Sequence, residues 1–424
     1  MDMKQIIDDL KSRNLIFQIT HENLGAILSS EKPPVYCGFD PTGLSLHLGN
    51  LLLITVLMRF QQAGIRPIVL VGGATGMIGD PSGKSSERRL LGKDEVEANV
   101  AALQTQLGKF LDFDKGSYSA LIVNNFDWFH RVLFIDFLRD IGKHFSLGSM
   151  LAKEATKNRL ETGISFTEFS YALMQAYDFL YLFDTFGCRI QLGGQDQWGN
   201  ITAGLELIRK LRGKEAFGIT FPLITTSSGN KFGKTEAGTI WLDARLTSPY
   251  QFYQYLINTG DGDVVQYLRS FTFLPMSEIE DYGESVSREP QKREAQKRLA
   301  WELTKLVHGE KEAGMAKNAS VVLFGGEVSE ISDETLEEIF PDVPKARFPM
   351  LVLSQGLDLV QALLSCHAAS SKGEARRLIG QGGVYVNNRK VTDLGYKLTS
   401  NDLASQHFSV IRTGKRNFFC LRFD

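Results

Sequence analysis

Features that would place the chain in a specialised class are scarce or missing from its 424 residues. No two cysteines have the spacing of a metal site, so neither a zinc site nor a disulfide framework is expected. No apolar run approaches the roughly 18 residues that a membrane span needs. The N-terminal stretch MDMKQIIDDL carries acids where an export signal is apolar. We therefore expect a cytoplasmic protein without a membrane segment.

The chain also has no overall excess of positive charge, since its net charge is −2 at pH 7. The charge is uneven, however. Residues 351–424 contain ten Lys and Arg against five Asp and Glu, a net of +5, so residues 1–350 carry −7. A small basic terminus on an acidic body indicates a local site for a polyanion, and the alternative is a solvated basic face.

Up to about residue 245, short β-rich runs alternate with helical runs. The strand candidates are VYCGFD, PIVLVGGATG, ALIVNNFDWF and RIQLGG. This alternation predicts an α/β fold with a Rossmann-like, mostly parallel sheet, whose ligands bind beyond the carboxyl ends of the strands. The polar loops after Gly38, Val71 and Leu192 lie at such ends.

The rest of the chain has a different pattern. Residues 246–324 are helical, most clearly in SPYQFYQYLINT and EAQKRLAWELTKLVHG, and residues 325–350 are acidic and resemble a linker. In residues 351–424, the helix candidates LDLVQALLS and SKGEARRLIG precede the hairpin candidate VYVNNRKV, with Asn387 and Asn388 at its turn. These patterns predict a helical domain and a small α+β domain.

The first polar loop leads into LLLITVLMRFQQAG, which is expected to be a buried helix ending at Gly64. Thr42 and His47 flank the start of this helix, where free N–H groups favour anions. Gly49 has no side chain, so a flat ring could lie against the backbone. The alternative is an ordinary helix start with a spare polar face.

Two further loops carry cations in glycine-rich surroundings. GGATGMIGDPSGKSSER contains Lys84 and Arg88, but it is not a P-loop because Ile78 occupies a position that requires glycine. SSGNKFGKTEAG contains Lys231 and Lys234. By themselves these loops could be an ordinary turn and solvated charge.

The segment SFTEFSYALMQAYDFLYLF is more specific. Ser165 and Glu168 form a capping box, so a helix should start there. Tyr171, Gln175 and Asp178 then share one face of that helix. A polar stripe usually faces solvent, but the other faces are too apolar for a surface helix, so we expect this stripe to face a cleft.

Together these motifs resemble the bacterial tyrosyl-tRNA synthetases, which are class I aminoacyl-tRNA synthetases, over almost the whole chain. YCGFDPT, HLGN, VGGATGMIGDPSGK, SFTEFSYALMQAYDF, GGQDQWGNI and KFGKT occur in the order of that family. The resemblance implies activation of L-tyrosine with ATP and transfer of the tyrosyl group to tRNA(Tyr). It also implies a homodimer with a dimer-forming insertion within residues 1–245, and Mg²⁺ held by the ATP phosphates rather than by the protein.

The resemblance also implies roles for individual residues. The residues expected to stabilise the phosphates are Thr42, His47, Lys84, Arg88, Lys231 and Lys234. Those expected to hold tyrosine are Tyr36 and Asp178 at its hydroxyl, Asp80, Tyr171 and Gln175 at its ammonium group, and Gln197 near its carboxylate. Those expected to hold the nucleotide are Cys37, Gly38, Asp40, Gly49, Asn50 and Asp196.

The C-terminal segment resembles the small αL RNA-binding motif. The residues expected to hold tRNA phosphates, which position RNA without reading its sequence, are Lys372, Arg376, Arg377, Arg389 and Lys390. The chain departs from the family pattern at two positions. Asn50 replaces a frequent histidine, and Gln195 replaces the serine of GGSDQW, which puts a longer side chain near the ATP site.

Three rival interpretations explain less of the pattern. Tryptophanyl-tRNA synthetases share the fold, but an indole pocket has no use for an ionised Asp178 beside Tyr36. An adenylate-forming ligase of the pantothenate-synthetase kind would not need a basic RNA-binding terminus. A non-catalytic RNA-binding protein would not need the phosphate-handling residues.

Overall fold

The computed structural model describes residues 5–82, 90–114, 116–153, 156–157, 163–235, 238–323, 331–340, 343, 345–414 and 417–424. The chain forms two compact units. The first contains residues 1–247 and 260–295, and the second contains residues 248–259 and 296–424. In the described part of the chain, no helix is long and apolar enough to cross a membrane.

The first unit alternates strands and helices. Its helices are α1 (Gln5–Ser12), α2 (Leu24–Glu31), α3 (Leu51–Gln62), α4 (Lys93–Leu107), α5 (Phe126–Phe129), α6 (Phe134–Asp140), α7 (Leu147–Leu151), α9 (Phe166–Phe186), α10 (Trp198–Arg212), α12 (Asp261–Phe271) and α13 (Met276–Arg288). Its strands are β1 (Gln18–Ile19), β2 (Val35–Phe39), β3 (Pro67–Val71), β4 (Leu121–Asn124), β5 (Ile190–Gly194), β6 (Phe217–Phe221), β7 (Lys234–Thr235) and β8 (Gly238–Thr239).

A six-stranded sheet with the order β1-β6-β5-β2-β3-β4 forms the centre of this unit. All its neighbouring strands are parallel except β1, which pairs antiparallel with β6. The mostly parallel sheet is therefore confirmed, and the four predicted strands are β2 to β5. No local pattern indicates the two-residue β1, because only its long-range pairing with β6 makes it a strand.

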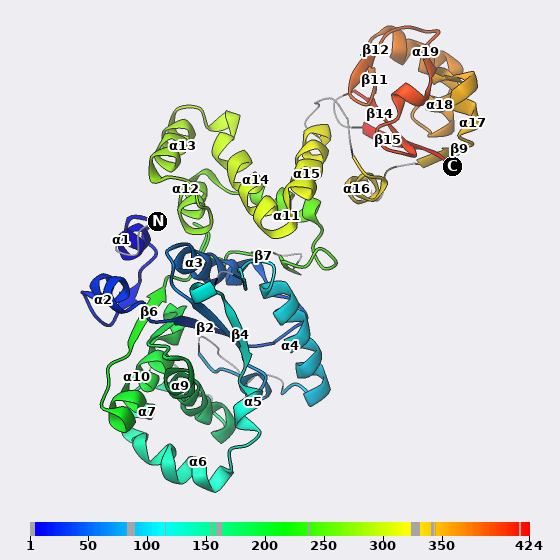
Figure 1. The fold of residues 1–424 in the computed structure, drawn as a ribbon. Coiled ribbons are helices and arrows are strands. Elements are labelled where there is room, and N and C mark those ends of the chain that lie inside the picture. Colours follow the sequence, from blue (N-terminus) through cyan, green and yellow to red (C-terminus); the bar gives the residue numbers. More distant parts are fainter. Residues whose placement is uncertain are drawn as a thin grey trace. The chain divides into compact units, whose positions relative to one another are not determined.

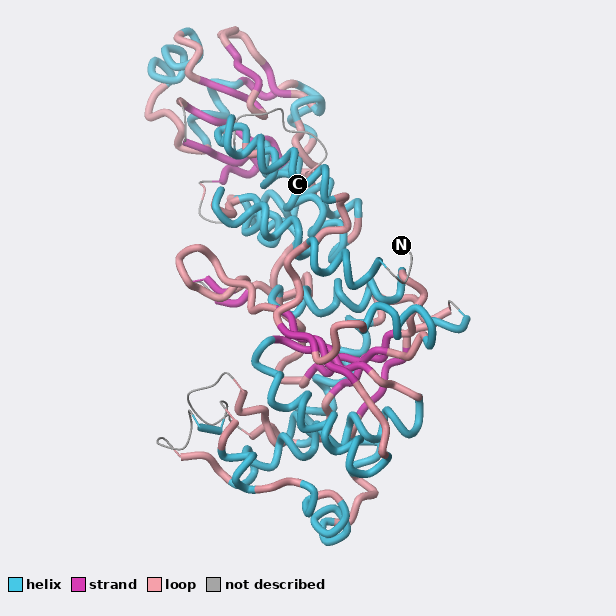
Figure 2. Tube along the Cα trace, turned by 90° about the vertical axis from the view of Figure 1, so that its left-hand side faces the viewer, coloured by secondary structure: helices cyan, strands magenta, loops and turns pink. Residues whose placement is uncertain are grey.

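Helices cover both faces of the sheet (Figures 1 and 2). Helices α9 and α10 pack on one face around a core that includes Tyr36, Leu70 and Phe179. Helix α3, predicted to be buried, has nine buried residues among its twelve. Two glycines mark its boundaries, since Gly49 lies one residue before Asn50, its N-cap, and Gly64 turns away with a φ of 80°.

The strand order determines where a ligand can bind. After β2 the chain builds outward through β3 and β4, and it then returns to the other side of β2 with β5 and β6. In an open α/β sheet, the crevice at such a reversal, outside the carboxyl ends of the strands, is the usual ligand site. The loops that follow β5, β2 and β3 therefore lie side by side there.

The second unit contains helices and a smaller sheet. Its helices are α11 (Pro249–Ile257), α14 (Glu294–His308, starting at the boundary), α15 (Glu310–Leu323), α16 (Asp333–Ile339), α17 (Leu351–Gln355), α18 (Leu359–Ser365) and α19 (Lys372–Gly380). Its strands are β9 (Lys345–Phe348), β10 (Leu357–Asp358), β11 (Val384–Val386), β12 (Arg389–Val391), β13 (Lys397–Leu398), β14 (Phe408–Thr413) and β15 (Asn417–Phe423). The helices predicted over residues 246–324 form, and they divide between the two units.

The C-terminal hairpin is confirmed as β11 and β12. Asn387 and Asn388 have φ values of 47° and 62°, the left-handed pair that a two-residue hairpin turn requires. Helices α18 and α19 cover one face of the five-stranded sheet β12-β11-β14-β15-β9.

Residues 325–350, expected to be a linker, contain α16 and β9. Leu336 and Phe340 of this segment pack with Phe408 in one core, and β9 pairs parallel with β15. The acidic composition suggested a linker because the acids outnumber the apolar residues that anchor the helix. The tertiary packing of those few apolar side chains orders the described part of the segment.

Candidate functional site

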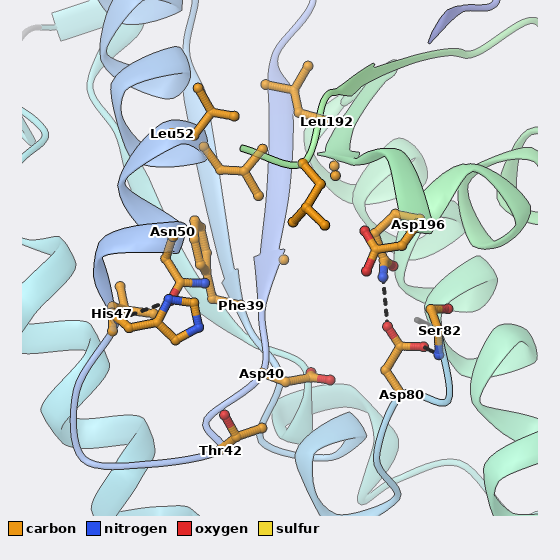
Figure 3. Close-up of a pocket in the computed structure, with 18 of the residues that line it drawn as sticks. Phe39, Asp40, Thr42, His47, Asn50, Leu52, Asp80, Ser82, Leu192 and Asp196 are labelled. Carbon is orange, nitrogen blue, oxygen red and sulfur yellow. Dashed lines mark hydrogen bonds between the residues drawn. The ribbon is translucent and has the colours of Figure 1, made fainter. Parts of the chain in front are cut away.

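The carboxyl ends of β5, β2 and β3 border a cavity of about 380 Å³, shown in close-up in Figure 3. Most residues singled out in the sequence line it, although they come from separate loops and helices. These residues are Tyr36, Gly38, Asp40, Thr42, His47, Gly49, Asn50, Asp80, Tyr171, Gln175, Asp178, Asp196, Gln197, Lys231 and Lys234. Lys84 and Arg88 lie outside the described residues.

Cys37 is not among the residues that line the cavity. Successive side chains of a strand point to opposite faces of the sheet, so Cys37 shares its face with Phe39, which lines the cavity, and not with Tyr36. Burial raises the pKa of the Cys37 thiol to about 12. The expected contact of Cys37 with the nucleotide stays a prediction.

One polar group at the cavity wall is organised around Asp178 on α9, whose side chain is buried. Its Oδ1 accepts a hydrogen bond of 2.9 Å from Nε1 of Trp128, and its Oδ2 accepts one of 3.0 Å from Nδ2 of Asn125. Burial raises the pKa of the Asp178 carboxyl, and these two donors oppose the rise. Two donors on two oxygens leave the group an acceptor with lone pairs to spare.

Tyr36 on β2 lies beside this carboxylate. Its side chain is 1% exposed, and its hydroxyl has no hydrogen-bond partner in the described part of the chain. Burial and the negative charge of Asp178 raise the pKa of Tyr36 well above its usual value, so the hydroxyl is a neutral donor. A buried hydroxyl without a partner is costly, and a ligand hydroxyl between Tyr36 and Asp178 would supply the missing bond.

A second polar group surrounds Asp80, which follows β3. Its Oδ2 accepts a hydrogen bond of 2.7 Å from Nε2 of Gln197, and its Oδ1 accepts one of 2.9 Å from the backbone N–H of Ser82 (Figure 3). Asn200 links Gln197 to Gln175 by donating to both side-chain oxygens. This network holds a carboxylate and amides at the cavity wall, which suits a ligand ammonium group.

Asp40 connects β2 to α9 and to the loop after β3. Its Oδ2 accepts a hydrogen bond of 2.7 Å from the hydroxyl of Tyr171, and its Oδ1 accepts one of 2.8 Å from Thr75. A Cβ at position 72 would lie 2.1 Å from Oδ1 of Asp40, so only Gly72 permits this approach. Burial and Asp40 raise the pKa of Tyr171, which keeps its hydroxyl a donor.

Thr42, His47 and Asn50 lie at the opposite end of the cavity from Asp80 (Figure 3). Leu48–Asn50 form a short 3₁₀ turn that leads into α3. A Cβ at position 49 would meet the imidazole ring of His47 at 3.0 Å. Gly49 therefore accommodates the ring of His47 and leaves the backbone open.

Lys231 and Lys234 extend from a loop that is fixed to α12. The ring of Phe232 packs 4.2 Å from that of Tyr267 and 5.0 Å from that of Phe271, measured between ring centroids. Asp263 accepts a hydrogen bond of 2.9 Å from the backbone N–H of Ser227. Aromatic packing thus anchors this loop beside the cavity, and both lysines remain exposed.

Gln195, which replaces the serine of the family pattern, bonds a neighbouring segment of the cavity wall. Its Oε1 accepts a hydrogen bond of 3.1 Å from the backbone N–H of Leu223. The longer side chain thus joins the end of β5 to the segment after β6, and both residues line the cavity.

The sequence analysis missed three residues of this site. Asn125 and Trp128 lie just after β4, and the run ALIVNNFDWF indicates only a strand. The available signal was a polar residue and an aromatic residue following a strand that neighbours β3. Gln191 of β5 also lines the cavity, and its buried Oε1 has no hydrogen-bond partner in the described part of the chain.

The basic residues of the second unit lie on the surface of its C-terminal part. Lys372, Arg376 and Arg377 are exposed on α19, and Arg389 and Lys390 are exposed on β12. Arg389 also approaches Oδ1 of Asp402 at 3.2 Å. These side chains offer hydrogen-bond donors and positive charge, but they do not line the cavity at the ends of β5, β2 and β3.

Comparison with known proteins gives two family matches. Residues 29–325 match the model of class I tRNA synthetases (W and Y), and residues 335–421 match the tyrosine–tRNA ligase SYY-like C-terminal domain. The tyrosine–tRNA ligase of Roseiflexus castenholzii is 49% identical over 99% of this chain and 100% of its own. That of Bacillus caldotenax is 52% identical over 99% of each chain.

Solved structures of tRNA synthetases are also similar to this chain. A C-terminally truncated mitochondrial tyrosyl-tRNA synthetase of Aspergillus nidulans is similar with a TM-score of 0.67 and 33% identity, covering 75% of this chain and 94% of that chain. A tryptophanyl-tRNA synthetase of Plasmodium falciparum shares the fold with a TM-score of 0.53 at 15% identity, covering 80% and 90%.

Proposed function

Because the chain belongs to the tyrosine–tRNA ligases of the class I tRNA synthetase family, we propose how its residues divide the work of that reaction. The enzyme activates tyrosine with ATP, releasing pyrophosphate, and transfers the tyrosyl group to tRNA. A carboxylate is already a nucleophile and pyrophosphate is a competent leaving group. The site therefore needs positioning and stabilisation of developing charge rather than a catalytic base.

The unpartnered hydroxyl of Tyr36 beside Asp178 is the observation that carries the assignment of the tyrosine pocket. The substrate hydroxyl would donate to Asp178 and accept from Tyr36. Its ammonium group would lie among Asp80, Tyr171 and Gln175, and Gln197 would line the same pocket near the reacting carboxylate. Phenylalanine would leave buried polar groups unpaired, which is more costly than losing a contact with water.

The other end of the cavity would take the nucleotide. Thr42 and His47 would stabilise the β- and γ-phosphates, with Lys231 and Lys234 adding charge from their loop and Lys84 and Arg88 acting in the same way. Gly38, Asp40, Gly49 and Asn50 would hold the adenosine side, together with Asp196, which reaches it from the side of Asp80 (Figure 3). Mg²⁺ would arrive on the ATP phosphates; no cluster of three or more acidic, His or Cys side chains among the described residues could hold an ion.

We propose that residues 1–245 catalyse both steps, that 246–324 hold the anticodon arm, that 325–350 connect the two parts, and that 351–424 bind tRNA. The net charge of +5 on residues 351–424 supports the last assignment, together with the exposed Lys372, Arg376, Arg377, Arg389 and Lys390. All four cysteines are free and buried, which suits a reducing cytoplasm.

We also propose a homodimer, with an apolar surface on and beside α6 as its interface. Leu133, Phe134 and Ile135 are 70%, 65% and 69% exposed. Three consecutive large apolar residues exposed to this degree are unusual on a monomer and typical of an interface. The segment lies between β4 and α9, within the residues 1–245 in which the insertion was expected.

Exchange of labelled pyrophosphate into ATP tests the proposal in one assay. Exchange should require tyrosine, should fail with tryptophan or phenylalanine, and should require magnesium. The isosteric variant Asp178→Asn should lose tyrosine-dependent exchange while keeping the wild-type unfolding transition. Equal exchange with tryptophan, or full activity of Asp178→Asn, would contradict the assignment of the pocket.

A further inference from the structure

Helix α4 has two buried amide side chains on a face that is otherwise apolar. Asn99 and Gln106 are 3% and 8% exposed, and they lie seven residues apart, so they share a face with Val96 and Leu103. Amide side chains are seldom buried unless they form hydrogen bonds. The bonds of this pair all lead to one short segment of the chain.

That segment is residues 41–46, which connect β2 to the 3₁₀ turn. Asn99 donates through Nδ2 to the carbonyl oxygen of Pro41 at 3.0 Å. Gln106 accepts through Oε1 from the backbone N–H of Leu46 at 2.7 Å, and it donates through Nε2 to Ser45 at 3.1 Å. The two amides thus hold both ends of the segment.

The bonded backbone groups immediately precede the two residues assigned to the phosphates. The carbonyl of Pro41 belongs to the peptide bond that joins it to Thr42, and Leu46 directly precedes His47. On its other side, the segment is held by Leu242, whose N–H donates to the carbonyl oxygen of Leu46 at 2.9 Å. Residues 41–46 form no helix or strand of their own, so these bonds define their path.

We infer that Asn99 and Gln106 are positioning residues for tyrosine activation, with Asn99 fixing Thr42 and Gln106 fixing His47. This inference rests on the proposed phosphate role of Thr42 and His47. Donors that stabilise developing charge must already be in place when the charge appears. Loss of either amide bond therefore slows the chemical step, whereas tyrosine, which binds at the other end of the cavity, is held as before.

The first test removes each amide while keeping its volume, with Gln106→Met and Asn99→Leu. The kcat of tyrosine-dependent pyrophosphate exchange should fall about tenfold to a hundredfold, and the Kd of tyrosine should stay within twofold. The matched control is Gln61→Met. Gln61 is 4% exposed and bonds the backbone of Asp112 and Tyr118, which do not line the cavity. Its removal should lower stability without changing kcat.

The second test is a double-mutant cycle. In a His47→Ala background, Gln106→Met should change kcat by less than about twofold, and Asn99→Leu should do the same in a Thr42→Ala background, because each amide acts through the residue already removed. The inference would be overturned if the losses of kcat multiplied in both cycles. It would also be overturned if Gln61→Met lowered kcat as much as Gln106→Met does, or if both single variants folded and kept the wild-type kcat.

The controls separate the two levels of the proposal. If His47→Ala and Thr42→Ala leave kcat unchanged, the phosphate role itself is wrong. If they lower kcat but the losses multiply, only the positioning role is wrong. If Gln106→Met fails to fold, the double-mutant cycle of Asn99→Leu with Thr42→Ala tests the positioning role by itself.

Discussion

Oδ1 of Asn50 accepts a hydrogen bond of 3.0 Å from the backbone N–H of His47, and this bond closes the turn that leads into α3 (Figure 3). The oxygen of the amide is therefore engaged within the protein. Its nitrogen is the part of the side chain left to donate to a ligand in the cavity that Asn50 lines. One side chain thus combines a structural bond and a potential contact with the nucleotide.

Replacing Asn50 by alanine removes both contributions. We expect Asn50→Ala to lose about 0.5–1.5 kcal/mol of transition-state stabilisation, which is about two- to tenfold in rate. Asn50→His retains a ring N–H donor, so its rate should be close to that of the wild type. His47→Ala should be slower than either variant of Asn50, because the side chain of His47 faces the charge that develops on the phosphates. Pyrophosphate exchange at saturating substrates measures all three, and a wild-type rate for a well-folded Asn50→Ala would reduce Asn50 to a helix-surface residue.

Tyr36→Phe should separate stability from specificity. Removing a buried hydroxyl that has no partner should leave the free energy of unfolding unchanged or raise it by up to about 1 kcal/mol. The kcat/KM for tyrosine should fall about two- to tenfold, with little change for phenylalanine. Denaturant titration and exchange kinetics with both amino acids provide the measurements. An unchanged ratio between the two amino acids would exclude Tyr36 from the pocket.

Lys153 should make stability depend on pH in the alkaline range. Its Nζ donates to the carbonyl oxygen of Gly199 at 2.7 Å, and burial lowers its pKa from 10.5 to about 8. Because the folded pKa is lowered, stability is fully present above pH 10.5 and is lost as the pH falls towards 8. Relative to the Lys153→Met variant, the free energy of unfolding of the wild type should fall by about 1–3 kcal/mol between pH 10.5 and pH 8. It should not fall further below pH 8. If the difference in unfolding free energy between the wild type and Lys153→Met were the same at pH 7.5 and pH 10.5, the prediction would be wrong.

The basic face of α19 should affect tRNA but not adenylate formation. We expect the triple variant Lys372→Gln, Arg376→Gln and Arg377→Gln to weaken tRNA binding and to reduce the slope of log K against log salt by about 2. Exchange of pyrophosphate should be unchanged. A charge-matched control replaces three exposed lysines of the first unit, Lys11, Lys32 and Lys93. Substitution is preferable to deletion of residues 351–424, because deletion would expose the apolar side of α16.

The exposed apolar residues of α6 predict the assembly state. Phe134→Glu with Ile135→Glu should shift the protein from dimer to monomer in sedimentation velocity, since two charges cannot be buried in an apolar interface without partners. Glu substitutions at the exposed Asp136 and Arg139 of the same helix provide the control. A double variant that remains dimeric would place the interface elsewhere.

Sequence alone determined the features that depend on near neighbours in the chain. The side chain of Ser165 accepts a hydrogen bond from the N–H of Glu168 at 3.2 Å, as the capping pattern predicted. Asn387 and Asn388 turn the hairpin because asparagine tolerates positive φ. The strand ends, and with them the loops that carry most candidate site residues, followed from the alternation of β-rich and helical runs.

Only the tertiary structure decided which distant groups meet. Trp128 reaches Asp178 across 50 positions of sequence and Gln106 reaches Leu46 across 60, and no local pattern marks either pair. The strand pattern placed Cys37 beside Tyr36 but could not say which of the two lines the cavity. A side chain's direction follows from its position in the strand or helix, whereas its partner follows from how elements pack, and packing is set by the whole chain.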